Sequence, residues 1–213
     1  MGLFQKIRRK YYKLRGMRDP KEVYGYKHPT AKIPVDATIY STENLYVDED
    51  AGFLPGALIM NPRSKFILKK HSGASHNLTV VPGNHLCLVG KWKNDITDKI
   101  KDELIKDNEY DKDIVVDEDV WMGVNVTLMN GVHIGRGCII GGGSVVRNST
   151  PPYSIVLGNP AKVVGFVFTP EEIVAHEKML YPENERLPIE LLENNYNKFF
   201  INRIADIKQF TRL

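Results

Sequence analysis

The sequence predicts a mainly β protein, a solenoid of short parallel strands with helical segments before and after it. Three observations predict this fold class. Six consecutive six-residue blocks fill the chain from Val116 to Pro151 without a gap. Each block opens with an apolar residue, and its fifth position is small or β-branched. The fourth position, which suits residues that tolerate a positive φ or form Asx turns, carries Asp119, Asn125, Gly131, Gly137, Gly143 and Ser149.

Other regular structures do not fit this repeat. Six residues of an α-helix advance by about 600°, so the apolar positions would scatter around the helix axis. A flat strand has no need for a turn-tolerant residue in every block. Short strands joined by a corner every six residues do fit, and they stack into a solenoid with a continuous interior.

We assign the solenoid to residues 31–165. Its first coils are less regular than the later ones, and the block template recurs there with corner residues at Asp36, Asp50 and Gly56. Residues 86–113 leave the repeat and carry many charges of both signs. A long insertion inside a compact repeat is often functional, so we expect an arm that leaves one corner of the solenoid. The alternative is a solvated loop with a short helix.

Helical segments are expected at both ends of the chain. Within residues 1–30, residues 1–18 carry seven Lys or Arg and no acid, with apolar residues at helical spacing. This basic amphipathic helix could lie on an anionic membrane, or it could pack its apolar stripe against the solenoid. Residues 166–213 form a helical tail, which can cover the open end of the solenoid. Its first helix begins with a capping box at Thr169, and a second is expected from Pro188 through Ile204.

Composition limits the classes of function. Hydrophobic residues make up 42% of the chain and charged residues 26%, as in soluble globular proteins. A net charge of +3 and the lack of a recognisable motif argue against a nucleic-acid partner. Cys87 and Cys138 lie far apart, and no stretch is long and apolar enough to cross a bilayer. We therefore expect a reduced, cytoplasmic protein.

Three ordered segments resemble the end of the solenoid in one known family. Residues 119–124, 140–146 and 158–164 are similar to segments of the hexapeptide-repeat acyltransferases, in particular the branch that modifies xenobiotics and polysaccharides. The resemblance implies a left-handed parallel β-helix, transfer of an acetyl group from acetyl-CoA, and a homotrimer with the donor between subunits. A fold does not fix a function, so a non-catalytic assembly solenoid is the alternative from another class.

His85 is the candidate general base. It follows Asn84 directly before the arm, and an imidazole can take a proton near neutral pH because its ordinary pKa is about 6.5. In the family that the chain resembles, a Gly/Asn-His unit at a coil corner before a long loop has this role. His85 would deprotonate the acceptor as it attacks the thioester, with Asn84 beside the substrate and a backbone N–H stabilising the oxyanion.

The same resemblance assigns the donor site. Val124 and Gly142 would line the pantetheine groove through backbone groups, which small residues allow to come close to a ligand. Arg147 and Lys162 would face the phosphates or the adenine end of acetyl-CoA, and ordinary exposed cations are the alternative for both. Trp121 would shape the wall of the substrate site, unless it packs at a corner.

The acceptor is predicted to be a sugar hydroxyl of a polysaccharide or its precursor, because the basic N-terminal helix favours such a substrate over a diffusible compound. N-acetylation of an amino sugar, serine acetylation and antibiotic acetylation are the alternatives within the same class. His71 and His76 resemble two of the three zinc ligands of the γ-class carbonic anhydrases. The region where the third should lie contains Val35, so no metal is expected.

Overall fold

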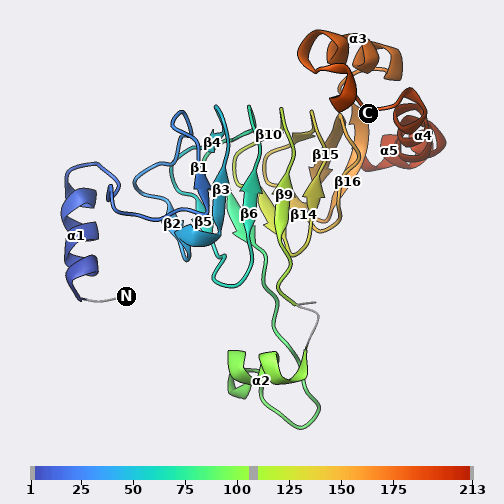
Figure 1. Cartoon of the computed structure of the whole chain (residues 1–213). Coiled ribbons are helices and arrows are strands. Elements are labelled where there is room, and N and C mark those ends of the chain that lie inside the picture. Colours follow the sequence, from blue (N-terminus) through green and yellow to red (C-terminus); the bar gives the residue numbers. More distant parts are fainter. Residues whose placement is uncertain (1–2, 106–109, 212–213) are drawn as a thin grey trace.

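The computed structural model describes residues 3–105 and 110–211, and these residues form a three-sided coil of parallel sheets (Figure 1). The first sheet contains β1 (Tyr26–Lys27), β3 (Leu45–Val47), β6 (Phe66–Leu68), β9 (Ile114–Val116) and β12 (His133–Ile134). The second contains β4 (Gly52–Phe53), β7 (Gly73–Ala74), β10 (Trp121–Met122), β13 (Ile139–Ile140), β15 (Ser154–Gly158) and β16 (Ala161–Phe166). The third contains β2 (Thr38–Ile39), β5 (Leu58–Ile59), β8 (Thr79–Val81), β11 (Thr127–Met129) and β14 (Val145–Val146).

From β3 to β14, successive strands belong to the three sheets in rotation, so the chain winds once around the axis for every three strands. Trp121 pairs with Ile139, and Thr127 pairs with Val145. Each pair joins equivalent positions of blocks that stand three apart in the repeat. This register confirms the predicted solenoid, and β1 shows that the first coil already begins within the segment assigned to the N-terminal linker.

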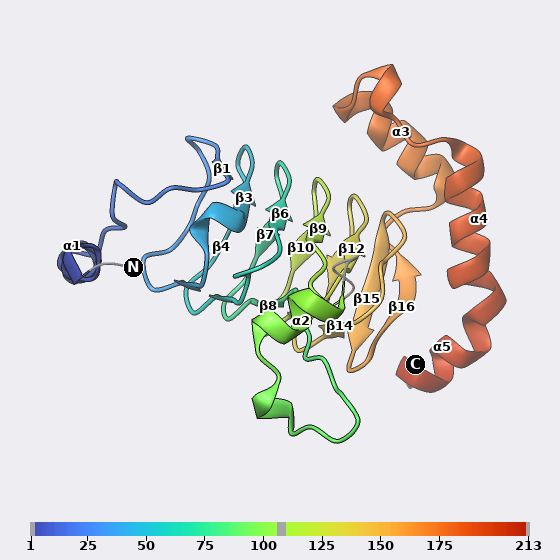
Figure 2. The same cartoon turned by 60° about the horizontal axis from the view of Figure 1, so that its bottom comes forward.

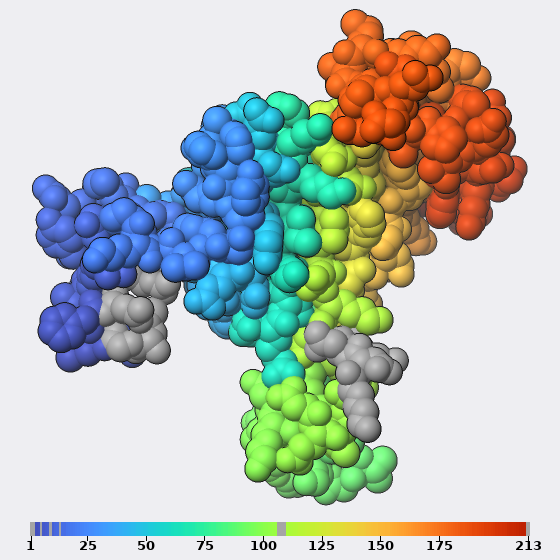
Figure 3. Space-filling view, in the orientation of Figure 1, coloured from blue at the N-terminus to red at the C-terminus, as the bar shows by residue number. Residues whose placement is uncertain are grey.

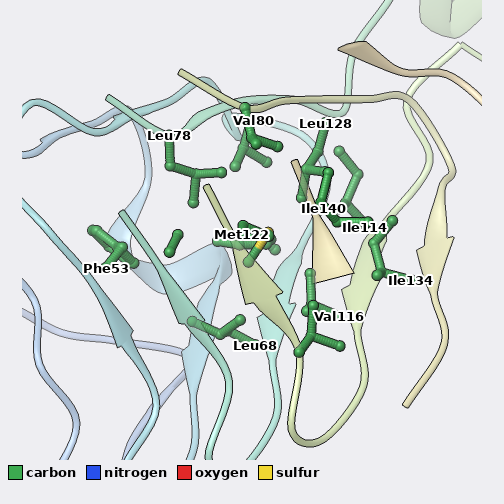
Figure 4. Packing of buried hydrophobic residues seen from close by; sticks show 14 of the residues in the cluster. Phe53, Leu68, Leu78, Val80, Ile114, Val116, Met122, Leu128, Ile134 and Ile140 are labelled. Atoms are coloured by element: carbon green, nitrogen blue, oxygen red, sulfur yellow. The ribbon is translucent and has the colours of Figure 1, made fainter. Parts of the chain in front are cut away.

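The repeat positions have the burial that the sequence predicts (Figure 4). All six block-opening side chains are at most 1% exposed, and all six fifth-position side chains are at most 9% exposed. Full burial of such a side chain contributes about 1.5–3 kcal/mol, so the ladder of apolar side chains is the main source of stability. The fourth positions from Asp119 to Gly143 all have a positive φ. Ser149 does not, and its hydroxyl accepts a hydrogen bond from the His133 N–H at 2.9 Å.

Residues 82–113 leave the corner between the third and first sheets and extend away from the coil (Figure 2). The described part of this excursion contains a 3₁₀ turn, Lys93–Asp95, and the short helix α2 (Asp98–Leu104). Thr97 caps α2 by accepting a hydrogen bond from the Ile100 N–H. A further 3₁₀ turn, Thr42–Asn44, precedes β3. The arm, residues 86–113, is thus attached at one level of the coil.

The ends of the chain carry the other helices. At the N-terminal end, α1 (Leu3–Leu14) stands away from the coil. At the other end β16 pairs antiparallel with β15, and the tail follows it with α3 (Pro170–Leu180), a 3₁₀ turn Glu183–Glu185, α4 (Ile189–Phe199), a 3₁₀ turn Ile201–Arg203 and α5 (Ile204–Thr211). None of the helices in the described ranges is long and apolar enough to cross a bilayer.

The predicted capping box is confirmed, because Thr169 and Glu172 exchange side-chain and backbone hydrogen bonds at the start of α3. The predicted single second helix is wrong. Phe200, with φ −123° and ψ −69°, leaves the helical region and separates α4 from α5. Apolar spacing continues across this break, which is why the sequence pattern did not reveal it.

Candidate active site

The turn that carries His85 is fixed by the return of the arm. Gly83 bridges to Asp111 in antiparallel fashion, and the Lys112 N–H donates to the Pro82 carbonyl at 3.1 Å. The Asn84 N–H donates to the Tyr110 carbonyl at 2.6 Å. Because both ends of the excursion pair with each other, the backbone around His85 is held although its side chain is exposed.

An ionic cluster strengthens this closure. Asp111 is only 4% exposed and accepts from the Arg63 guanidinium at 2.8 Å and from Lys101 Nζ at 2.7 Å. Arg63 also pairs with Asp102 on α2, and Lys101 donates to the Asn84 carbonyl at 2.8 Å. The hydrogen bonds that Arg63 donates to Asp102 and Asp111 raise the pKa of Arg63. The cluster therefore joins α2, the base of the arm and the coil through charge-assisted hydrogen bonds.

A cleft of about 370 Å³ lies between the third sheet and the arm, and His85 and Asn84 are in its wall. Its apolar lining comes from both sides, with Met60, Val81 and Met129 from the coil and Ile96 from the arm. Arg63 and Lys101 supply the polar part of the wall. A concave, partly apolar cleft with a few converging polar groups is typical of a small-molecule site.

The residues predicted to bind the donor lie at another corner. Val124 and Gly142 are exposed neighbours in successive coils, in the corner between the second and third sheets (the donor corner, residues 123–126 and 141–144). The Gly143 N–H donates to the Val124 carbonyl at 2.8 Å. A Cβ at Gly123 would lie 2.6 Å from the Gly142 nitrogen, so only glycine permits this stacking of the two turns.

The other predicted site residues do not meet in one chain. Trp121, 53% exposed, lies on β10 beside the donor corner, with its ring against Gly73. Arg147 follows β14 at the corner from which the arm leaves, while Lys162 lies on β16, with Nζ 5.1 Å from the Phe210 ring centroid. The structure brings Asn84 together with His85, and Val124 together with Gly142. It separates these two pairs by the width of the third sheet.

The predicted catalytic and donor-binding residues nevertheless lie at successive levels along the solenoid axis. His85 follows β8, Val124 lies one coil further on, Gly142 two coils further on, and Lys162 beyond that. Neighbouring strands are about 4.8 Å apart, so His85 and Gly142 differ by about 10 Å along the axis. An extended ligand parallel to the axis could contact all these levels.

Residues 113–148 match the family described as bacterial transferase hexapeptide (six repeats). Over these residues the chain carries the repeat of the hexapeptide transferases. A protein from Lysinibacillus sphaericus described as a probable macrolide acetyltransferase is 38% identical over 109 residues. That alignment covers 51% of this chain and 56% of the relative, so the chain spans little more than half the length of that protein.

Two solved structures share the hexapeptide-repeat fold. A maltose O-acetyltransferase from Clostridium difficile 630 has a TM-score of 0.58 at 20% identity and covers 78% of this chain and 90% of its own. A hexapeptide-repeat acetyltransferase from Vibrio cholerae O1 biovar eltor, complexed with acetyl-CoA, has a TM-score of 0.58 at 18% identity, with 77% and 88% covered. At these identities the likeness concerns the fold.

The remaining histidines lie outside the cleft. His71 and His76 are exposed corner residues, and His71 has a φ of 59°. His133 is bonded to Asp117 at 2.7 Å, which raises the pKa of His133. His176 lies in α3. Within the described ranges, no three or more His, Cys, Asp or Glu side chains are grouped so that they could hold a metal ion.

The sequence did not single out Arg63, Lys101 or Asp111. Lys101 and Asp111 stand among many charged residues of the arm, and Arg63 precedes a strand with no repeat position to mark it. Nothing in their spacing shows that they meet, because the contact depends on how the arm folds back. Their contacts hold the base of the arm beside the turn of His85.

We expect Asp111→Asn to loosen the arm. The change removes the charge shared by Arg63 and Lys101, and hydrogen bonds to charged groups contribute about 1.5–3 kcal/mol. Amide hydrogen exchange at Asn84 and Lys112 should become faster, and proteolysis within the arm should increase. Asp95→Asn, at an exposed position of the same arm, is the matched control. Unchanged exchange at both amides would show that the backbone pairing alone holds the turn.

Proposed function

We propose that the protein is an acetyl-CoA-dependent O-acetyltransferase of the cytoplasm, with His85 as general base. The observation that carries the proposal is the placement of an exposed histidine, on a fixed turn, in the wall of a cleft. His85 takes the proton of an acceptor hydroxyl as its oxygen attacks the thioester carbonyl. The new ester bond forms, the carbon–sulfur bond breaks, and the imidazolium returns its proton to the thiolate of coenzyme A.

The donor is proposed to lie along the donor corner, with its pantetheine arm against Val124 and Gly142 and its phosphates toward Lys162. Arg147, which lies at the corner of the arm, would reach the phosphates from the neighbouring subunit. In one chain the third sheet separates this corner from His85. A homotrimer of left-handed coils, in which the donor corner of one subunit faces the cleft of the next, joins the two halves. Threefold closure suits such a repeated heterologous contact.

The acceptor is proposed to be a sugar hydroxyl of a polysaccharide or its precursor. Asn84 and Lys101 beside His85 offer polar groups for neighbouring hydroxyls. A macrolide hydroxyl is the second candidate, supported by the likeness to the probable macrolide acetyltransferase and by the apolar side chains Met60, Val81, Ile96 and Met129 in the cleft. Such side chains would cover the apolar body of an antibiotic.

Release of free thiol from acetyl-CoA tests this function directly. The full chain is incubated with acetyl-CoA and, separately, with neutral oligosaccharides, amino sugars, serine or a macrolide. We expect release that depends on the presence of a hydroxyl acceptor, and mass spectrometry should find one added acetyl group on it. Acetylation of an amino sugar at nitrogen would contradict O-transfer. Absence of both acetyl-CoA binding and thiol release would favour the non-catalytic solenoid.

We expect Val124→Glu to raise the KM for acetyl-CoA about tenfold or more, with little change in kcat, because it removes donor binding and not chemistry. Val124 is already 45% exposed, so the carboxylate has no folding cost from burial. Leu54→Glu is the matched control, since Leu54 is 42% exposed in the turn after β4, at the same side of the coil and two coils away. Steady-state kinetics with varied acetyl-CoA measure both. Equal effects of the two changes would place the donor elsewhere.

A further inference from the structure

The helix α1 has an apolar face that no part of the described chain covers. Leu3, Phe4 and Leu14 are 72%, 89% and 80% exposed, and Ile7 and Tyr11 are 58% and 51% exposed. Figures 1 and 3 show α1 standing off the N-terminal end of the coil. The alternative that this stripe packs against the solenoid of its own chain is therefore wrong.

Cations border this face on both sides. At about 100° per residue, the five apolar residues from Leu3 to Leu14 fall within an arc of about 100°. Lys6 and Lys10 border the arc on one side, and Arg8 and Arg15 border it on the other. Residues 1–18 contain seven of the 29 Lys and Arg of the chain and none of its 26 Asp and Glu. An apolar stripe between rows of cations is the pattern of helices that lie in a lipid interface.

Ion pairs of Arg8 and of the linker after α1 hold the helix in place without covering its apolar stripe. The Arg8 guanidinium pairs with Asp19 at 2.5 Å, and Arg18 pairs with Glu22 at 2.8 Å. Arg18 also donates to the Pro34 carbonyl at 2.8 Å, which ties the linker to the first coil. The linker turns at Gly16, whose φ is +68°. The apolar face is thus presented outward from a fixed attachment.

We propose that α1 binds the surface of an anionic lipid membrane and holds the solenoid there. Its apolar side chains enter the boundary between headgroups and acyl chains, and Lys6 and Lys10 contact the lipid phosphates. The charge of the helix favours an anionic membrane over a neutral apolar partner. Burial of the apolar stripe alone would tolerate Asp or Glu nearby, and residues 1–18 contain neither. The proposal is independent of the acetyl-transfer reaction, since it concerns where the protein resides.

Cosedimentation of the full chain with lipid vesicles tests the proposal. Vesicles of phosphatidylcholine with about one-third phosphatidylglycerol should bind the protein, pure phosphatidylcholine should bind it much less, and high salt should weaken binding. Each cation near an anionic surface contributes about fivefold, so Lys6→Glu with Lys10→Glu should lower the partition coefficient about thirtyfold or more. Phe4→Ala with Ile7→Ala should lower it about tenfold or more.

Two control variants carry similar changes, a charge reversal and a loss of an exposed apolar side chain, in the tail instead of α1. Lys178→Glu with Lys208→Glu alters two exposed lysines of the tail, and Met179→Ala removes a side chain that is 84% exposed. Both should bind vesicles within about twofold of the unaltered protein. Circular dichroism confirms that each variant is folded.

Three outcomes would overturn the proposal. The first is equal binding to neutral and anionic vesicles, or none to either. The second is vesicle binding that neither α1 variant reduces. The third is a change of the sedimentation coefficient without lipid when Phe4 and Ile7 are replaced, which would assign the face to a second copy of the chain.

Discussion

Replacing His85 with alanine is expected to lower kcat for acetyl transfer by about 10²–10⁴-fold, the usual contribution of a positioned general base. The side chain is exposed, and the hydrogen bond at this residue comes from its backbone N–H, which donates to Asn84 Oδ1 at 2.9 Å. Folding stability should therefore stay within about 0.5 kcal/mol of the unaltered protein, as for most surface substitutions. Thiol release with the best acceptor and urea unfolding measure the two quantities.

His71→Asn is the matched control for this substitution. His71 is also an exposed histidine at a turn of the same coil, but it lies at the corner between the first and second sheets, away from the cleft and the donor corner. Asparagine accepts its φ of 59°. We expect its rate to be unchanged within about twofold. A His85 variant with full activity would show that another group takes the proton and that the cleft serves only binding.

The features that follow local rules were predictable from the sequence. A corner every six residues needs a residue that accepts a positive φ, and Asp119 to Gly143 meet that need at each turn. The interior of the coil needs an apolar or small side chain at two positions per block, and Val116 to Val146 supply the first of them. Thr169 and Glu172 stand three residues apart, so the capping box that they form is visible in the local sequence. In each case the cause lies within a few residues of the feature.

Features that depend on distant partners were not predictable. Arg63 meets Asp111 across 48 residues, and their contact exists only because the arm folds back on the corner that it left. The separation of His85 from Val124 by the third sheet also has no counterpart in the linear repeat. The break at Phe200 was missed because apolar spacing on either side continues a helical pattern.

Glu177 is the residue of the tail for which we expect the largest effect on stability. It lies in α3 at 1% exposure, and its carboxylate accepts from Arg136 at 3.1 Å, from the Tyr153 hydroxyl at 3.0 Å and from the Leu187 N–H at 2.5 Å. Burial and the nearby Glu177 raise the pKa of Tyr153, so its phenol stays protonated and donates. One side chain thus joins α3, the last coil and the approach to α4.

Glu177→Ala is expected to lower the free energy of unfolding by about 3 kcal/mol, near the lower end of the range for breaking a buried ion pair. Arg136 would keep Glu118 at 3.3 Å and its position 4.0 Å from the centroid of the Tyr181 ring, which limits the loss. The Tyr153 hydroxyl and the Leu187 N–H would lose their partner. Urea unfolding measures the change, and Glu193→Ala, at an exposed position of α4, should alter it by less than about 0.5 kcal/mol.

The region that loses stability should distinguish the effect of Glu177→Ala from the effect of a change at His85. Each coil contacts mainly its neighbours, so a defect at the end of a solenoid spreads inward only gradually. Hydrogen exchange in the Glu177→Ala protein should become faster in α3, α4 and β16, while β6 and β8 beside His85 stay protected. Thiol release at low temperature and saturating acetyl-CoA should then be unchanged. Loss of activity together with early exchange in β8 would instead show that the tail and the His85 cleft unfold as one cooperative unit.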